Sequence, residues 1–360
     1  MTWRVHTIGC IRVHVSADLA LLSPSGIEWG APGPASGEPD MVLQQSTDRI
    51  WPELDGVRAG PRLLLLDNGF AERNELFEIE VQLGPPVDLR IHILPHHPRH
   101  RLTSVLLHGS ADPRVLAVQR LFSYHYFWSI LHLLMLSRSM GFLHAAVLDK
   151  DGAVAVCGTG GCGKSSVADL LIEHHGFDYL AEDFAIVSAD GTTHLSPRTI
   201  PVYEHDLEHR GTDYRARFRA SQPRVSRLAW MLRSLAGGDP MRRVAPRHLY
   251  GADRLCERST IKAGFLLVRG RTPDPRIQDL GIEQFAGHAA HASFREMRSF
   301  YEVSHQIAAN LPHRSLDMRS MFDETVELYK ACFAQAALWR IDLPPGDVGG
   351  GVSLIRRALG

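Results

Sequence analysis

The chain has 360 residues, a length that suggests two domains of ordinary size rather than one. Hydrophobic residues make up 44% of the sequence and charged residues 22%, so the chain can bury a sizeable core and is not intrinsically disordered. The formal net charge of -1 excludes a protein that binds nucleic acid through bulk positive charge. We expect a folded protein without a nucleic acid partner.

Cysteine usage and hydropathy bear on the compartment. The cysteines are odd in number, widely spaced and free of a CxxC pair, which argues against a disulfide framework and a structural zinc site; they are Cys10, Cys157, Cys162, Cys256 and Cys332. The N-terminus lacks the basic start and apolar core of a secretory signal. The longest apolar run, 121–137, contains two histidines and is bounded by arginines, which favours a buried helix over a membrane span. These features predict a cytoplasmic protein without a membrane partner.

The first hundred residues are predicted to be mostly β. Residues 3–15 alternate between polar and apolar with a period near two, and the pattern recurs in several later segments. These extended segments are 62–66, 76–83, 88–94 and 102–107. A stretch rich in proline and glycine at 23–40 is predicted to be a loop. We expect a β-rich N-terminal domain over residues 1–113.

After residue 113 the pattern changes to alternating helices and strands. An apolar helix at about 115–140 precedes predicted strands at 141–149 and 153–157, a glycine-rich loop and a helix that begins near Lys164. Further predicted strands are 179–180, 184–187 and 262–269, and predicted helices are 281–309 and 318–338. This order is typical of an α/β nucleotide-binding core, so we expect one over 114–341 with C-terminal helices. Residues 342–360, rich in glycine and proline, are predicted to be a flexible tail.

The sequence from Gly158 to Ser165 matches the phosphate-loop pattern G-x-x-x-x-G-K-[ST], between a predicted strand and a predicted helix. Glycines let consecutive backbone N–H groups point at phosphate oxygens, and the helix N-terminus adds partial positive charge. Lys164 is then expected to reach the β- and γ-phosphates and the Ser165 hydroxyl to bind Mg2+. The predicted nucleotide-binding residues are Gly158, Thr159, Gly160, Gly161, Cys162, Gly163, Lys164, Ser165 and Ser166. The expected ligands are therefore ATP and Mg2+.

An acidic pair, Glu182 and Asp183, follows the predicted helix at the next strand-like segment. A phosphate loop needs a carboxylate near its metal and, for group transfer, a group that receives the proton of the acceptor. Side chains alternate along a strand, so the two acids would face different ways unless the chain bends there. A solvated turn is the alternative interpretation.

Three segments in this order resemble the HPr kinase/phosphorylase family: the Leu143-His144 strand, the phosphate loop, and the Glu182-Asp183 pair. A fourth stretch, 196–201, is similar to one in HPr-kinase-related proteins, so the resemblance covers about 142–203. It implies an α/β fold with a P-loop kinase core of the HPr kinase type, and it hints at a homo-oligomer. Asp183 would accept the proton of the acceptor hydroxyl, His144 would polarise or position that hydroxyl, Lys164 would act in catalysis, and Glu182 would help to hold the metal.

The resemblance is incomplete in two ways. Glu182 stands where the family usually has Asp, which keeps the charge but lengthens the side chain. The C-terminal signature used for HPr recognition and phosphorolysis has no counterpart, so the bifunctional enzyme is not expected. The chain looks closer to related kinases that phosphorylate biosynthetic precursor peptides.

Three further features of the sequence bear on function. Ten arginines lie between 210 and 247, where they could form a lid or substrate arm, a solvated helical face or, without supporting aromatic spacing, a nucleic acid surface. The histidine-rich run 92–100 is interrupted by prolines and lacks nearby acids or cysteines, which argues against metal binding. Cys162 lies inside the loop, where redox control of nucleotide use is a hypothesis.

The sequence thus predicts an ATP- and Mg2+-dependent kinase. We expect it to phosphorylate a hydroxyl group, that of serine above all, on a protein or precursor peptide. Two alternatives stay open: a nucleotide-gated binding or assembly protein with little phosphotransfer, and a kinase of a free small molecule such as serine.

Overall fold

The chain folds into two compact units that alternate along the sequence. The computed structural model describes residues 3–16, 37–51, 54–95, 97–108, 112, 122, 126–204, 207, 212–235, 237–270, 272–310 and 318–360. The first unit comprises Met1–Leu134, Thr199–Ala245 and Ser299–Met318, and the second comprises Met135–Arg198, Pro246–Arg298 and Arg319–Gly360. The predicted consecutive segments 1–113 and 114–341 differ from this arrangement, because the chain returns to the first unit twice.

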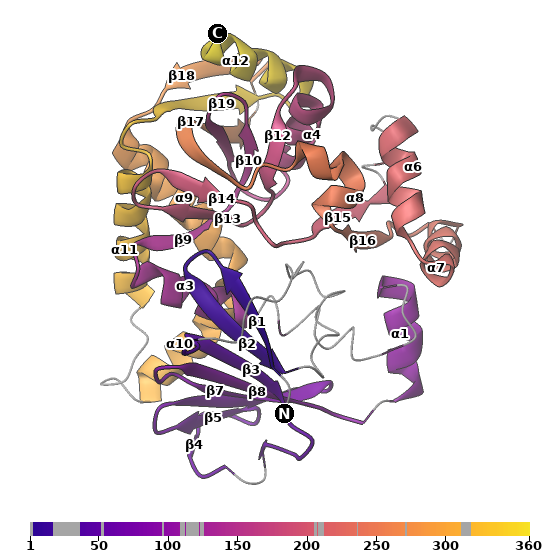
Figure 1. Cartoon of the computed structure of the whole chain (residues 1–360), viewed down its shortest axis with the longest axis vertical. Helices are drawn as coiled ribbons and strands as arrows, with labels where there is room; N and C mark the ends of the chain where they lie inside the picture. The colour runs from indigo at the N-terminus through magenta and orange to yellow at the C-terminus, as the bar shows by residue number, and fades with distance from the viewer. Residues whose placement is uncertain are drawn as a thin grey trace. The chain divides into compact units, whose positions relative to one another are not determined.

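The first unit is built on an eight-stranded sheet, counted over the described residues, in the order β1-β2-β3-β8-β7-β6-β5-β4 (Figure 1). Its strands are β1 (Trp3–Ile8), β2 (Ile11–Ser16), β3 (Met41–Gln45), β4 (Val57–Arg58), β5 (Leu63–Leu66), β6 (Gly69–Arg73), β7 (Phe77–Gln82) and β8 (Val87–Ile93). Strands β2, β3 and β8 pair in parallel, and the other neighbours pair antiparallel. Alternate residues are buried, as in β2 and β8, where the period of two in the sequence reflects one face on the core.

The predicted strand at 102–107 is wrong, because this segment lies in helix α1 (Pro98–His108). A short apolar run has no clear period, and the proline at the first helical position suits a helix start. The return of the chain adds strands β15 (Ile200–Tyr203) and β16 (Met241–Val244) and helices α6 (Thr212–Ser221) and α7 (Arg224–Leu235). Helix α1 contacts both α7 and β16 within the same unit.

Part of the predicted apolar helix at 115–140 lies outside the described residues, and its described part contains α3 (Trp128–Leu136). His132 in this helix is fully buried, and burial lowers its pKa to about 3, so the imidazole is neutral. Among the helices of the described residues, none is both long and apolar enough to cross a membrane.

The second unit is built on a nine-stranded sheet, counted over the described residues, around the long strand β17 (Arg258–Arg269). Strand β17 pairs in parallel with β11 (Ala153–Cys157) and β19 (Ala337–Leu343), and its first residues pair antiparallel with β14 (Thr192–His194). The sheet also contains β9 (Met140–Leu143), β10 (Ala145–Asp149), β12 (Asp178–Ala181), β13 (Ala185–Ser188) and β18 (Arg276–Asp279). Every residue of β11 is buried, which explains its unbroken apolar sequence.

Helices cover this sheet. They are α4 (Lys164–His175), α8 (Pro246–Tyr250), α9 (Ile282–Glu296), α11 (Met318–Cys332) and α12 (Gly349–Leu359). The single helix predicted for 281–309 is divided into α9 and α10 (Arg298–Asn310). Side chains of α9 and α11, such as Phe285 and Leu328, join the buried core with Leu143 and Val147 of the strands. The fold is therefore mixed α/β, with the glycine loop between β11 and α4.

The prediction of a flexible tail at 342–360 is wrong. Helix α12 buries Val352, Leu354 and Ile355, and it contacts α4 (Figure 1). Buried Gly351 explains why a glycine-rich sequence forms a packed helix: a Cβ placed there would lie 3.1 Å from Leu343 and 3.5 Å from Val167, so the small residue permits close approach.

We predict that Ile355→Ala lowers the free energy of unfolding by about 3 kcal/mol, because it removes a fully buried side chain from this packing. Urea unfolding followed by circular dichroism measures the change. Arg356→Ala, at the exposed neighbouring position, serves as the control and should stay within about 0.5 kcal/mol of wild type. Equal effects of the two variants would contradict the packing of α12.

Candidate functional site

The glycine loop leaves the end of buried strand β11 and enters α4, as the phosphate-loop pattern predicts. Gly158, Gly161 and Gly163 have positive φ angles of 145°, 80° and 98°. At Gly158 a Cβ would also lie 2.6 Å from the backbone oxygen of Leu267, so any side chain there would collide with β17. At Gly160 a Cβ would meet no atom within 4 Å. The loop therefore presses against the sheet at its start and is open further along.

The N-terminus of α4 gives the end of the loop a partial positive charge. Gly163 is the N-cap residue and, among the described residues, no side chain caps the helix by a hydrogen bond. The first turn of α4 contains no acidic side chain. The helix thus presents its first N–H groups and its positive end without an internal anion, which suits binding of an external one.

Lys164, the first residue of α4, is buried, with 7% of its surface exposed. Its Nζ donates hydrogen bonds to the backbone oxygens of Gly158 at 2.8 Å and Thr159 at 3.3 Å. It also lies 3.0 Å from Nε2 of His144. The Lys164 side chain thus connects two carbonyl groups at the start of the loop with His144, which lies between β9 and β10.

His144 lies in a break between β9 and β10, where the single strand predicted for 141–149 is divided. Strand β9 pairs with β13, whereas β10 pairs with β11 and β12, so the chain changes partners at the histidine. The backbone N–H of His144 donates to Ser293 Oγ of α9 at 2.9 Å. Helix α9, which packs on the sheet, therefore holds His144 in place through this hydrogen bond.

The contacts of the His144 ring assign its tautomer. Nδ1 lies 3.0 Å from the backbone oxygen of Asp183, which can only accept, so Nδ1 carries the proton. Nε2 is then the acceptor for the ammonium group of Lys164. Burial, with Lys164 as the next cause, lowers the pKa of His144 to about 4. The imidazole is thus neutral and links the lysine of the loop to the acidic segment.

The acidic pair lies in a bend between β12 and β13, not on a strand. Asp183 has a φ of 69°, a left-handed conformation that Asp tolerates better than most residues. The backbone N–H of Phe184 donates to the oxygen of Glu182 at 3.0 Å and tightens the bend. Glu182 is buried, while the Asp183 side chain is 26% exposed. The chain bends at the two acids, so alternation along a strand does not apply to them, and their surroundings still differ: one side chain is buried and the other is partly exposed.

Arg198 also lies at the site. The sequence indicated it only as a member of the stretch 196–201, without a role of its own. Its Nη2 is 3.6 Å from Asp183 Oδ2, and its guanidinium lies 4.5 Å from the ring centre of Phe184. The Arg198 side chain is only 3% exposed. Ser196 Oγ donates to the oxygen of Phe184 at 2.8 Å and ties the segment to the bend. A buried guanidinium thus positions the carboxylate of Asp183.

A pocket of about 330 Å³ adjoins the loop. Its walls are Gly158–Cys162, the end of β17 from Leu266 to Arg269, His288 and Ala292 of α9, and Arg340 of β19. Arg340 Nη2 is held by Asp342 Oδ1 at 2.8 Å. The loop therefore borders a cavity that is also lined by the cationic side chains of Arg269 and Arg340.

The structure brings several predicted site residues together and leaves others apart. Lys164, His144 and the backbone of Asp183 form one hydrogen-bonded chain. Ser165 is half-buried in the first turn of α4, Ser166 beside it is exposed, and Cys162 is buried in the loop. Sequence reasoning missed Ser293 entirely, because the 149 residues that separate it from His144 leave no local signal.

The described residues contain no group of three or more histidines, cysteines or acids that could hold a metal ion. The histidine-rich run 92–100 spans the end of β8 and the start of α1, and His96 lies outside the described residues.

Comparison with known proteins adds little. No family model matches the chain, and no curated protein matches its sequence. Among solved structures, the Hpr(Ser) kinase/phosphatase from Coxiella burnetii is similar with a TM-score of 0.27 and 10% sequence identity, over 61% of this chain and 97% of that one. A similarity this low carries no argument about activity, so the function has to be argued from the site.

We predict that Gly158→Ala lowers the free energy of unfolding by about 1–3 kcal/mol, because its φ is strained for alanine and its Cβ would collide with the backbone of Leu267. Gly160→Ala is the matched control in the same loop and should change stability by less than about 0.5 kcal/mol. Chemical denaturation of both variants without nucleotide measures the difference. A neutral Gly158→Ala would mean that the loop does not press on β17.

We also predict an acid-dependent loss of stability through His144. The unfolded state takes up a proton near pH 6.5 and the folded state only near 4, so this contribution is complete above pH 6.5 and is lost as the pH falls to about 4. At about 1.4 kcal/mol per pKa unit it amounts to roughly 3 kcal/mol. Urea unfolding of wild type and His144→Asn at pH 7, 6, 5 and 4 measures it, because buried His132 contributes equally to both. Identical pH slopes would show that His144 is not buried as a neutral ring.

Proposed function

We propose that the protein is a kinase that binds ATP with Mg2+ at the glycine loop and transfers the γ-phosphoryl group to a serine hydroxyl of a protein or biosynthetic precursor peptide. The observation that carries the proposal is the hydrogen-bonded chain from Lys164 through His144 to Asp183. It joins the lysine of the glycine loop to the backbone of the bend that carries the Asp183 carboxylate, a group that a mere binding protein does not need. Phosphoryl transfer requires both a phosphate cradle and a proton acceptor.

The loop supports a triphosphate as the ligand. A Cβ at Gly160 or Gly161 would meet no atom within 4 Å, so the outer part of the loop is open, and the uncapped end of α4 favours an anion. Lys164 now donates to two loop carbonyls and contacts His144. On binding, its ammonium would exchange the two loop carbonyls for phosphate oxygens, which carry more negative charge, and would keep its third donor on His144.

The residues also suit Mg2+, a hard cation that prefers oxygen ligands and keeps several waters. The Ser165 hydroxyl and the Glu182 carboxylate supply such oxygens, and phosphate oxygens would complete the set. When bound, Mg2+ neutralises charge on the phosphates.

Asp183 is the residue proposed to receive the proton of the acceptor. Its partly exposed carboxylate is positioned by Arg198, and its backbone is held by His144. The acceptor oxygen forms a bond to the γ-phosphorus as the bond from that phosphorus to the bridging oxygen breaks, ADP leaves, and the hydroxyl proton passes to Asp183. His144, which is neutral, keeps Lys164 and the acidic bend in register.

We predict that Lys164→Ala loses nucleotide binding and transfer, whereas Asp183→Asn keeps ATP binding and loses transfer by at least about 100-fold, because the amide cannot accept the proton. The assay incubates full-length protein with γ-labelled ATP, Mg2+ and a panel of serine-containing peptides, with intact mass spectrometry to detect an added phosphate.

Asp151→Asn is the matched control, since Asp151 also has a left-handed φ, of 54°, but lies exposed in the turn between β10 and β11. It should transfer phosphate at the wild-type rate. Transfer by Asp183→Asn at that same rate would remove Asp183 as proton acceptor. ATP binding without any labelled acceptor across a broad panel would favour the nucleotide-gated binding protein, and labelling of free serine would favour the small-molecule kinase.

A further inference from the structure

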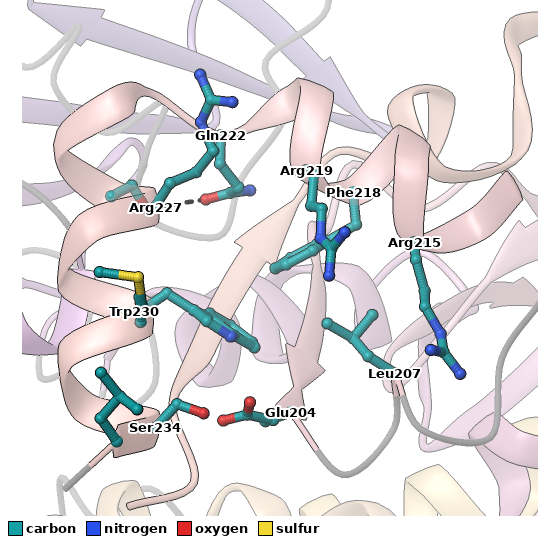
Figure 2. Close-up of a pocket in the computed structure, with 12 residues that line it drawn as sticks. Glu204, Leu207, Arg215, Phe218, Arg219, Gln222, Arg227, Trp230 and Ser234 are labelled. Carbon is teal, nitrogen blue, oxygen red and sulfur yellow. Dashed lines mark hydrogen bonds between the residues drawn. The ribbon is translucent and has the colours of Figure 1, made fainter. Parts of the chain in front are cut away.

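A second pocket, of about 470 Å³, lies in the first unit between helices α6 and α7, far along the chain from the glycine loop. Figure 2 shows Phe218 and Trp230 directed into the space between the two helices, with Glu204 and several arginines around it. The predicted arginine-rich segment therefore forms two helices with a pocket between them, rather than a uniformly solvated face.

The floor of this pocket is aromatic and held in place. The rings of Phe218 and Trp230 meet edge to face with centres 5.0 Å apart, and Phe218 is only 3% exposed. The buried guanidinium of Arg242 lies 5.8 Å from the ring centre of Trp230, and its Nε donates to Ser226 Oγ at 2.9 Å. Ser226 in turn donates to Gln222 Oε1 at 3.0 Å, the bond drawn in Figure 2. The pocket is thus formed before any ligand arrives, which lowers the entropic cost of binding.

An exposed apolar stripe continues from the pocket along α7. Its members, spaced as i, i+3, i+4 and i+7, lie on one face of the helix; they are Leu228, Met231, Leu232 and Leu235, with exposed fractions of 53%, 51%, 52% and 78%. Met231 and Leu235 also line the pocket, so the two apolar surfaces are continuous. Side chains this apolar and this exposed, in one row, mark a surface that another molecule covers.

The charged side chains around the apolar surface indicate the charge of the molecule that would bind there. Residues 212–235 contain six arginines and one acid, Asp213. Arg215, Arg219 and Arg227 line the pocket. Within the described part of the chain, no acidic side chain forms an ion pair with Arg219 or Arg227, and both are exposed. Guanidinium groups at this rim would pair with carboxylates of the ligand.

We propose that α6 and α7 form a docking site for an acidic, amphipathic peptide segment of the phosphate acceptor. Apolar side chains of the segment would lie on the α7 stripe and enter the Phe218–Trp230 pocket, while its Asp and Glu residues would pair with Arg219 and Arg227. The identity of the segment as part of the acceptor rests on the proposed kinase function, but its binding does not.

Charge and shape distinguish this occupant from other anions. A nucleic acid would match the arginines but not a row of aliphatic side chains. An anionic membrane would match a basic amphipathic helix, but a flat surface would leave the recessed aromatic floor unfilled. The concave pocket therefore favours a peptide with protruding side chains.

The first experiment measures binding of fluorescein-labelled peptides to the full-length protein by anisotropy, without nucleotide. The probe is a peptide of about 16 residues, long enough for a helix, with Leu and Trp at i, i+3, i+4 and i+7 and Glu elsewhere. One comparison peptide has the same composition in scrambled order, and another has Lys in place of Glu. We expect the probe to bind at least about tenfold more tightly than either.

Matched variants locate the site. Arg219→Glu/Arg227→Glu should weaken probe binding at least about tenfold. Arg217→Glu/Arg224→Glu, on the same helices but outside the pocket, makes the same change in charge and should weaken binding less than about threefold. Met231→Gln/Leu235→Gln tests the apolar part. Its control, Val57→Gln, alters another exposed aliphatic residue of the unit, in β4, and should leave binding unchanged.

Several results would overturn the docking site: equal binding of the three peptides, equal effects of the two arginine pairs, or binding to phosphatidylserine vesicles without binding to the probe. Because probe binding is measured without ATP, failure of the kinase proposal leaves this result intact. Conversely, phosphotransfer to an acceptor that is unaffected by Arg219→Glu/Arg227→Glu would support the kinase and would show that the docked segment is not part of the acceptor.

Discussion

The arrangement of the candidate site depends on one buried imidazole. His144 has one donor and one acceptor in its neutral form, and both are used, toward the backbone of Asp183 and toward Lys164. Burial, which disfavours the charged ring, is the largest cause of its low pKa, and the ammonium group 3.0 Å away is the next. The geometry of the loop and of the acidic bend is therefore linked through a group that has to stay neutral.

The surrounding fold serves this constraint. The chain breaks between β9 and β10 at His144, and Ser293 of α9 receives its backbone N–H. Tyr329 of α11 hydrogen-bonds both Ser293 and the backbone oxygen of Phe142, so two covering helices hold the strand that carries the histidine. Arg198 adds a second buried cation beside Asp183. Buried polar groups that are paired in this way rigidify a site, because unpaired alternatives are costly.

The order of the chain connects the two proposed activities. Arg198, which positions Asp183, is the last residue of the second unit before the chain enters the first unit at Thr199. The same excursion forms α6, α7 and the pocket with the exposed stripe. In the proposed kinase, the glycine loop would serve phosphoryl transfer, which is common to many acceptors, and the α6–α7 surface would distinguish among the acceptors.

The sequence by itself determined the glycine loop, the buried strand before it and the helix after it, because these elements depend on adjacent residues whose φ angles and burial are locally encoded. It also indicated the acidic pair, from its place after the helix and the need of a phosphate loop for a carboxylate, and it indicated His144 through a family resemblance. It misjudged 342–360, because the role of Gly351 in α12 depends on its close approach to Val167 and Leu343, and the local sequence does not show that approach. Only the tertiary structure decided that Ser293 and Arg198 meet the site, that the chain alternates between two units and that the arginine-rich segment encloses an aromatic pocket. These features join residues distant in sequence, and pairing over such separations leaves no pattern in a single chain.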